Sequence, residues 1–312
     1  MNVHFWGVRG SLPAPLTPQQ VQAKISAAIQ RIQPKDIATE SARAQFTASL
    51  PDWLYGTTGG NTPCVEVTSE GRTKLVFDAG TGLRVMGRLG ERPSDLHYHI
   101  FLSHFHWDHI QGLPFFEPAY NPQAQLDIYS PFDHIKERLE EQMREPYYPV
   151  RMDALTKNIR FHVMEPANPY IVGDVTVSAM RMSHPGGSFA FAVERQGRKV
   201  IYASDVELRP SDFERTAEHE AFFGGADVLI HDAQYTVEEA YTKQGWGHSA
   251  FCYVIDFAVA WNIKRLYLFH HDPTYDDRKI NEILQSARWY ASYIAQDAVQ
   301  VYLAVEGQDV RL

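Results

Sequence analysis

The segment H-F-H-W-D-H at residues 104–109 places three histidines and one aspartate within six residues, directly after a short apolar run. Imidazole nitrogens and carboxylate oxygens are the ligands that borderline divalent metals prefer. Alternate side chains of an extended segment point to the same side, so His104 and His106 can face one point together. Asp108 and His109 follow where the chain turns away, and they can face a second point nearby. A histidine-rich surface loop would crowd these polar groups without compensation, so the segment predicts two metals in one pocket.

Three further side chains of the same chemistry each follow an apolar, strand-like run: His184, Asp205 and His270. The pattern H-x-H-x-D-H, with these ligands after it in this order, resembles the metallo-β-lactamase fold hydrolases over nearly the whole chain. The resemblance is closest to their ribonuclease Z-like and cyclic nucleotide phosphodiesterase-like branch. We therefore expect an α/β (α+β) fold, an αββα sandwich of two mixed β-sheets flanked by helices.

The resemblance also implies how the ligands divide between two metals. Asp205 would bridge the two ions. The other ligands would form two sets, with His104, His106 and His184 at one ion and Asp108, His109 and His270 at the other. His271 follows His270 directly, and the residues alone leave both open as the ligand, although the resemblance favours His270. We expect two divalent ions per chain, zinc in the first place and manganese or iron otherwise.

His248 lies in the segment G-W-G-H-S at residues 245–249, before a run with the apolar periodicity of a helix. It resembles the extra histidine that ribonuclease Z-like phosphodiesterases carry before their last strand and metal histidine. β-Lactamases and glyoxalase II-type thioesterases do not share this feature. His248 and Asp108 are therefore the candidate catalytic residues. The alternative for His248 is a helix-flanking residue without a chemical role, and Ser249 is expected to cap that helix.

Four residues are expected to orient a ligand or to contact substrate: Asp78, Asn61, Asp232 and Tyr148. The resemblance places Asp78 behind the metal histidines as an acceptor that orients an imidazole, although it could equally cap the following helix. Asn61 ends a Gly-Gly-Asn turn, which is either a backbone nest for a phosphate oxygen or only a tight turn. Asp232 follows an apolar strand. Tyr148 lies in a stiff Pro-Tyr-Tyr-Pro segment, which borders a planar ligand or belongs to the core.

A polar, Ala- and Gln-rich segment at about 16–50 interrupts the strands of the first half. Apolar residues at intervals of three to four predict an amphipathic helix in its first part: Val21, Ile25, Ile29 and Ile32. The segment T-P-Q-Q at 17–20 is typical of a helix start, with a capping hydroxyl, an early proline and a capping-box glutamine. We expect a helical insertion in a single domain of residues 1–312. It is a packing element, a lid or a homodimer contact, and we favour a contact near the pocket.

The charge of the chain and the spacing of its ligands argue against a long anionic partner. Lys and Arg number 29 and Asp and Glu number 38, so the net charge is −9, a poor basis for binding many phosphates of a nucleic acid. Only residues 185–204 separate His184 from Asp205, where bacterial ribonuclease Z enzymes commonly place a long tRNA-gripping arm. We therefore expect a small-molecule phosphodiester substrate and no long nucleic acid.

The lengths of the apolar runs and the two cysteines bear on the cellular compartment that we expect for the protein. No apolar run approaches the roughly 18 residues that a membrane span needs, and the start of the chain does not resemble a signal peptide. We therefore expect no membrane partner and a cytoplasmic location. Cys64 and Cys252 are isolated in apolar surroundings and are expected to be buried free thiols.

Two divalent ions about 3.5–4 Å apart can lower the pKa of a shared water toward about 7, so that a metal-bridging hydroxide attacks the substrate at neutral pH. The ligand set therefore predicts a dinuclear metal-dependent hydrolase. His248 favours a phosphodiesterase, with a cyclic nucleotide as the leading substrate. A lactam, lactone or thioester hydrolase is the alternative enzyme, and a metal-bound sensor or binding module without catalysis is the alternative from another class.

Overall fold

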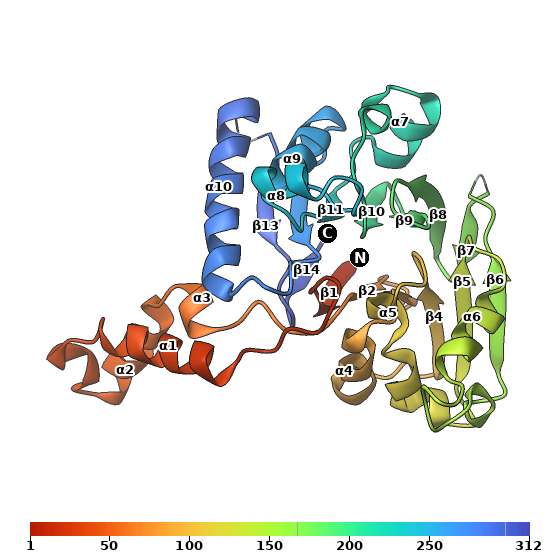
Figure 1. Cartoon of the computed structure of the whole chain (residues 1–312), viewed down its shortest axis with the longest axis horizontal. Coiled ribbons are helices and arrows are strands. Elements are labelled where there is room, and N and C mark those ends of the chain that lie inside the picture. The colour runs from red at the N-terminus through yellow and green to blue at the C-terminus, as the bar shows by residue number, and fades with distance from the viewer. Residues whose placement is uncertain (167, 297) are drawn as a thin grey trace.

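Two mixed β-sheets of seven strands each pack face to face in the computed structural model, which describes residues 1–166, 168–296 and 298–312 (Figure 1). The strand order is β14-β1-β2-β3-β4-β5-β6 in the first sheet and β13-β12-β11-β10-β9-β8-β7 in the second. The first sheet consists of β1 (Asn2–Gly7), β2 (Cys64–Thr68), β3 (Lys74–Phe77), β4 (His97–Phe101), β5 (Gln125–Ser130), β6 (Ile159–Val163) and β14 (Asp309–Arg311). The second consists of β7 (Tyr170–Val172), β8 (Val175–Met182), β9 (Ser188–Arg195), β10 (Arg198–Ala203), β11 (Val228–Asp232), β12 (Arg265–Phe269) and β13 (Gln300–Leu303).

Helices lie outside the two sheets (Figure 1). The α-helices of the described residues are α1 (Pro18–Ile29), α2 (Glu40–Ser49), α3 (Asp52–Tyr55), α4 (Thr81–Leu89), α5 (Trp107–Ile110), α6 (Ile135–Gln142), α7 (Ala217–Phe223), α8 (Val237–Thr242), α9 (Phe251–Ala260) and α10 (Asp277–Ala295). Short 3-10 turns are η1 (Pro34–Ile37), η2 (Leu113–Phe115), η3 (Glu117–Tyr120), η4 (Met152–Ala154) and η5 (Pro210–Phe213).

Apolar side chains fill the space between the sheets and the space under the helices. Phe77 and Phe101 of the first sheet meet Phe191 and Val228 of the second in the layer between them. A further apolar layer lies between the second sheet and the helices α9 and α10. Another lies between the first sheet and the helices α4 and α6. The αββα sandwich predicted from the sequence is therefore confirmed.

Both cysteines are buried and free, as predicted. Burial raises the pKa of the Cys64 thiol well above its ordinary value, so the nucleophilic thiolate is disfavoured there. Among the helices of the described residues, none is both long and apolar enough to cross a membrane.

The direction of the strands gathers polar residues at one edge of the sandwich. β3 and β4 are parallel neighbours in the first sheet, and β10, β11 and β12 are parallel neighbours in the second. Ligand sites of sheets with parallel strands form beyond the carboxyl ends of those strands. The residues that follow these ends include Asp78, His104, Asp205 and His270.

The predicted insertion forms an arm, defined here as α1, η1 and α2, which projects from the body beside α3 and α10 (Figure 1). Its first helix begins as predicted, because Thr17 and Gln20 form a reciprocal capping box. α1 contacts α3, and α3 contacts α10. Lys24 of α1 forms an ion pair with Asp277 at the start of α10. The arm is thus fastened at its base.

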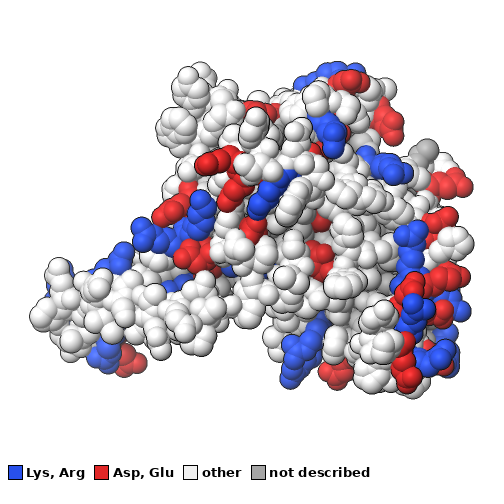
Figure 2. All heavy atoms as spheres, viewed as in Figure 1, with Lys and Arg blue, Asp and Glu red and all other residues white. Residues whose placement is uncertain are grey.

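The rest of the arm makes few contacts with the chain. No residue of α1 or α2 is buried, and Ile25 and Ile29 are 55% and 61% exposed. The arm surface seen in Figure 2 carries few charges. It extends away from α5, the helix of the metal-binding segment (Figure 1). The favoured contact near the pocket is therefore not formed within the chain.

Candidate metal centre

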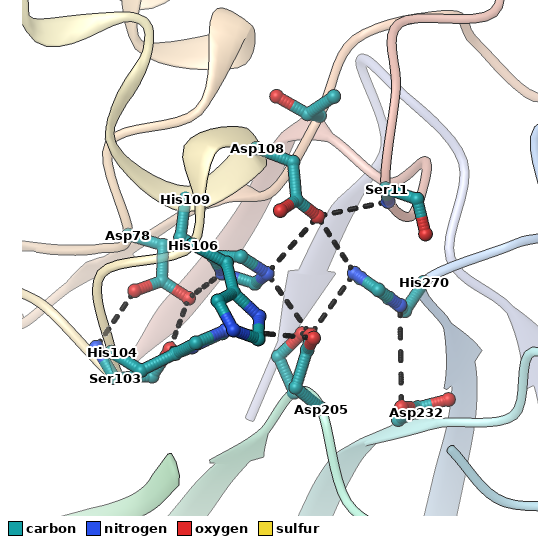
Figure 3. A network of polar contacts seen from close by, with 12 residues as sticks. Ser11, Asp78, Ser103, His104, His106, Asp108, His109, Asp205, Asp232 and His270 are labelled. Carbon is teal, nitrogen blue, oxygen red and sulfur yellow. Dashed lines mark hydrogen bonds and ion pairs between the residues drawn. The ribbon is translucent and has the colours of Figure 1, made fainter. Parts of the chain in front are cut away.

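The seven side chains expected to bind metal lie together beyond the carboxyl ends of the strands, and most of them are drawn in Figure 3. They come from the segment that follows β4 and from the residues after β8, β10 and β12. Three overlapping groups at this centre have ligand atoms within 4.8 Å of one another: His104, His106 and His184 with Asp205; Asp108 and His109 with His270; and Asp232, His248 and His270 with Asp205. The first two groups have the membership that the resemblance implies, and the third adds His248 and Asp232 beside them.

Asp205 follows β10 and presents one carboxylate oxygen to each of the first two groups. Its Oδ1 lies 3.0 Å from Nε2 of His109 and 3.0 Å from Nε2 of His270. Its Oδ2 lies 3.4 Å from Nε2 of His184 and 3.6 Å from Nε2 of His104. A carboxylate in this position can bridge two cations.

Asp108 lies in α5 and completes the second group. Its Oδ2 is 3.2 Å from Nε2 of both His109 and His270 (Figure 3). The same oxygen accepts the backbone N–H of Ser11 at 2.8 Å. A Cβ added to Gly10 would lie 2.6 Å from Nδ1 of His270, so the segment after β1 closes tightly against the site.

The pocket fits a cation, because two of its buried nitrogens are left without a hydrogen bond. Within the described part of the chain, Nε2 of His104 and Nε2 of His109 have no hydrogen-bond partner. Burial lowers the pKa of His104 well below its ordinary value. Burial also lowers the pKa of His109 and of His270, but the negative charges of Asp108 and Asp205 have the larger, opposite effect. The pKa of His109 is therefore well above its ordinary value, and that of His270 is raised to about 10. Without a cation, protons on these rings balance the carboxylates, and divalent ions would replace those protons.

Asp78 orients the ring of His109. Its Oδ2 accepts hydrogen bonds from Nδ1 of His109 at 2.7 Å and from the hydroxyl of Tyr202 at 2.6 Å. Ser103 donates its N–H and its hydroxyl to the same carboxylate, both at 2.8 Å. An acceptor on Nδ1 leaves Nε2 free for a metal. The alternative role for Asp78 is wrong, since α4 begins at the N-cap Gly80 without a side-chain cap.

The two histidines contributed by the second sheet are oriented by other partners. Nδ1 of His184 donates to the carbonyl oxygen of Gly247 at 2.8 Å. Nδ1 of His270 donates to Oε1 of Gln234 at 3.1 Å. In both rings Nε2 is therefore the nitrogen that faces Asp205.

His248 lies beside the metal groups and is held by Asp232. Its Nδ1 donates to Oδ2 of Asp232 at 2.6 Å, which leaves Nε2 as the remaining nitrogen. The ring centroid is 5.5 Å from that of His184 and 5.1 Å from that of His270. The prediction that Ser249 caps the next helix is wrong, because Ala250 is the N-cap of α9. The Ser249 hydroxyl instead donates to Val206 O at 2.6 Å.

The contacts of His271 and Asn61 bear on two alternatives that the sequence left open. His271 donates from Nε2 to Ala304 O at 3.0 Å, whereas Nε2 of His270 faces Asp108 and Asp205. The backbone N–H and the side-chain amide of Asn61 both donate to the carboxylate of Glu306, which therefore occupies the predicted phosphate nest.

Tyr148 also departs from the prediction. Its hydroxyl donates to Pro114 O at 3.1 Å, and its ring packs edge-on against Phe115. It lies against the apolar layer under α4 and α6. This packing agrees with the core alternative.

Sequence reasoning missed the backbone geometry of the site. Asp78, Asp205 and His270 have φ values of 60°, 56° and 61°, in the left-handed region that such residues rarely adopt. No local pattern marks these positions, apart from the fact that each follows a strand. The exposure of Trp107, at 81%, was also not predicted, although it lies between two ligands in sequence. Its neighbour in sequence, the candidate ligand His106, is exposed as well.

Comparisons with known proteins agree with this geometry. Residues 73–271 match the family described as beta-lactamase superfamily domain. A ribonuclease Z from Thermoplasma acidophilum is 24% identical over 258 residues, which cover 66% of this chain and 79% of that protein. The metallo-β-lactamase fold protein YhfI from Bacillus subtilis is 18% identical, with a TM-score of 0.65 and coverage of 99% of this chain and 98% of that one. A diphosphatase of the PhnP family is 15% identical, with a TM-score of 0.63 and coverage of 100% and 97%.

One expectation is overturned by these relatives. Ribonuclease Z is by its name a nuclease that acts on RNA, so the prediction that long nucleic acid is not a partner is wrong. Net charge is a sum over the whole surface, and cations at the centre can neutralise phosphate oxygens without lysines. The solved structures support the fold, and the family match spans well over half of the chain. The chain belongs to the β-lactamase superfamily, as a metal-dependent hydrolase of the metallo-β-lactamase fold.

Proposed function

We propose that this chain hydrolyses phosphodiester bonds of nucleotide substrates with two divalent cations, zinc in the first place. The proposed ligands of one cation are His104, His106, His184 and Asp205, and those of the other are Asp108, His109, His270 and Asp205. The two oxygens of Asp205, each directed at a different group of imidazoles, support the bridging role. The two buried Nε2 atoms without a hydrogen bond support the presence of cations.

The roles of the side chains follow from where their atoms lie. A pair of divalent cations would lower the pKa of a water held between them and neutralise the oxygens of the substrate. Oδ2 of Asp108 is fixed by the N–H of Ser11 and faces the imidazoles as a ligand, so Oδ1 is the oxygen left to accept a proton from the attacking water. Asp78 keeps the ring of His109 in one orientation through this step.

The observation that carries the phosphodiester assignment is the hydrogen-bonded pair of His248 and Asp232. Asp232 binds Nδ1, so the proton that His248 can give to substrate lies on Nε2, beside His184 and His270. A phosphodiester releases an alkoxide, which needs a proton when it leaves. A donor next to the metals fits that requirement.

The substrates we propose are nucleotide phosphodiesters, and cyclic nucleotides and RNA are the two forms to be compared. The relative named ribonuclease Z supports the bond type. The exposed ring of Trp107 next to His106 supports a base, because nucleobases stack on aromatic side chains at about 1–3 kcal/mol per base.

The test is a substrate panel with protein purified without chelator and loaded with zinc or manganese. The panel contains bis(p-nitrophenyl) phosphate, cyclic AMP, an RNA with a 3′ extension, nitrocefin and a thioester. We expect turnover of the phosphodiesters and none of the last two. Turnover of nitrocefin or the thioester alone would establish the alternative enzyme, and full metal content without turnover of any substrate would establish a binding module. The Asp205→Ala protein is the background control.

A further inference from the structure

A second group of ligand-type side chains lies at the opposite end of the strands from the metal centre. His97 and His99 belong to β4, and Asp127 belongs to the neighbouring parallel strand β5, in register with His99. Residues two apart in a strand share a face, so both imidazoles lie on the side of the carboxylate. Ligand atoms of the three residues lie within 4.8 Å of one another.

The group is accessible from solvent while its carboxylate is buried. Phe101 and Tyr129 lie further along the same face and belong to the layer between the sheets. The side chains of His97 and His99 are 22% and 15% exposed, whereas that of Asp127 is 5% exposed. An ion can therefore approach the imidazoles from solvent and contact the buried carboxylate of Asp127.

Residues of the edge strand β6 fix the carboxylate of Asp127. Arg160 donates from Nε to Oδ1 at 2.7 Å and from Nη2 to Oδ2 at 2.8 Å, and His162 donates from Nε2 to Oδ1 at 2.8 Å. Oδ2 also faces the two residues of β4, at 2.5 Å from Nε2 of His97 and 3.9 Å from Nδ1 of His99. Partners of this kind orient a carboxylate for a metal.

We propose that His97, His99 and Asp127 bind one zinc ion, with water in the fourth position. Zinc bonds of about 2.0–2.2 Å in a tetrahedron place neighbouring ligand atoms roughly 3.3 Å apart. His97 must therefore move outward from Oδ2 and His99 inward, each by less than about 1 Å, which side-chain rotation can supply.

An ion-pair network alone does not account for His99. His97, Arg160 and His162 can each bring a positive charge to Asp127. Nδ1 of His99 lies 3.9 Å from Oδ2 of Asp127, too far for a hydrogen bond, and contacts the hydroxyl of Tyr129 at 3.2 Å. A ring held beside the carboxylate without bonding to it adds nothing to the ion-pair network, whereas a shared metal ion would join the two.

This zinc would tie β4 to β5 and, through Arg160 and His162, to β6. A ligand that binds only the folded chain stabilises it by mass action. The site is independent of the proposed hydrolysis, since no contact of these residues reaches the metal centre among the contacts of the described residues.

Zinc titration of metal-free protein against a chromophoric chelator tests the proposal. The His97→Asn/His99→Asn variant should bind one zinc per chain fewer than its parent and hydrolyse bis(p-nitrophenyl) phosphate as fast. When the same two substitutions are made in the Asp205→Ala protein, whose metal centre is impaired, they should again remove one zinc ion per chain. His134→Asn, at a histidine whose side chain is 71% exposed, is the matched control and should bind as much zinc as the parent.

Two results would overturn the site. One is an unchanged zinc content in the double variant, and the other is an equal loss in His134→Asn, which would indicate adventitious binding to surface histidines. If the double variant does not fold, Asp127→Asn takes its place, because the amide keeps the shape and removes the charge. Its zinc affinity for the third equivalent should fall at least about 10-fold, and an unchanged affinity would refute the assignment.

Discussion

Asp205 is the residue at which the two groups of imidazoles meet, and its replacement should remove metal and activity together. Its oxygens face His109 and His270 on one side and His104 and His184 on the other. We expect Asp205→Ala to retain less than one metal per chain at the centre and to lose at least about 100-fold in kcat. Elemental analysis and hydrolysis of bis(p-nitrophenyl) phosphate measure both effects. Full activity in this variant would refute the bridging role, and Asp309→Asn, at an exposed carboxylate, is the control.

His248 should serve the leaving group and not the metals. His248→Ala is expected to keep its metal content while kcat falls by roughly 10²- to 10³-fold, the range for loss of one acid or one charge-stabilising donor. The loss should shrink with p-nitrophenolate as leaving group, because this anion leaves without a proton. Asp232→Asn should reproduce part of the loss, since it alters the hydrogen bond to Nδ1. A fall in metal content would make His248 a ligand instead.

Gly247 and Gly245 offer a matched pair for the loop that holds His184. Both have a left-handed φ, of 91° and 86°. A Cβ at Gly247 would lie 2.2 Å from Nδ1 of His184, whereas nothing lies within 4 Å of a Cβ at Gly245. Gly245→Ala should cost about 1 kcal/mol of stability and leave metal binding intact. Gly247→Ala should also weaken zinc binding by about 10- to 100-fold, measured by competition with a chelator. Equal zinc affinities would show that His184 tolerates the displacement.

The ligands could be predicted from local sequence because each follows a strand, whereas their orientation could not. The φ of His270, at 61°, turns its ring into the site and sends the ring of His271 to Ala304. A pattern of residue types contains no information about the φ angle of one residue. Asn61 binds Glu306 across 245 positions of sequence, and no local signal distinguishes that acceptor from a phosphate.

At the scale of elements, the base of the arm rests on Asp277. This buried carboxylate pairs with Lys24 of α1, accepts the N–H of Thr58 at 2.8 Å and lies 3.9 Å from the buried Arg9. Asp277→Asn should cost about 3 kcal/mol, because it removes the carboxylate that acts most strongly on the buried Arg9 and also the partner of Lys24. Lys24→Met should cost about 1 kcal/mol or less, because Arg9 keeps its partner.

Urea unfolding measures both variants, and limited proteolysis reports whether the arm is released. Faster cleavage within 18–49 is expected in both. Equal stability losses would contradict the view that Asp277 is shared between the arm and Arg9.

Strong periodicity made some elements predictable and left others undetected. The first helix of the arm was placed correctly, because its apolar pattern persists over several residues. β6 and β7 were not predicted. β6 alternates apolar residues with Arg160 and His162, as an edge strand does, and β7 has only three residues. The direction of the arm could not be predicted either, since it involves contacts of α1 with α3 and an ion pair with Asp277, a residue far along the chain.

At the scale of the whole molecule, His271 should make stability depend on pH. Burial, and then the charge of Arg9, lower its pKa to about 3, against about 6.5 in an unfolded chain. Because the folded pKa is the lower one, this stability is present above pH 6.5 and is lost as the pH falls toward 3. The loss should be about 2 kcal/mol between pH 6.5 and 5.

His271→Gln isolates this effect, because its amide can still donate to Ala304. Urea unfolding at pH 7 and 5 should show a smaller difference for the variant than for the parent, by about 2 kcal/mol. Identical pH dependence in the two proteins would mean that His271 takes up a proton in the folded state as well.

The left-handed backbone at Asp78, Asp205 and His270 has a consequence for how such a chain evolves. Each of these residues holds a conformation that costs on the order of 1 kcal/mol, and glycine would relieve it. Relief of backbone strain alone would favour glycine at these strand ends, but glycine would also remove the polar contacts of the side chains. Asp78 alone accepts four hydrogen bonds, from Ser103, His109 and Tyr202. Glycine would therefore become the more stable residue only in a descendant that had already lost these polar partners.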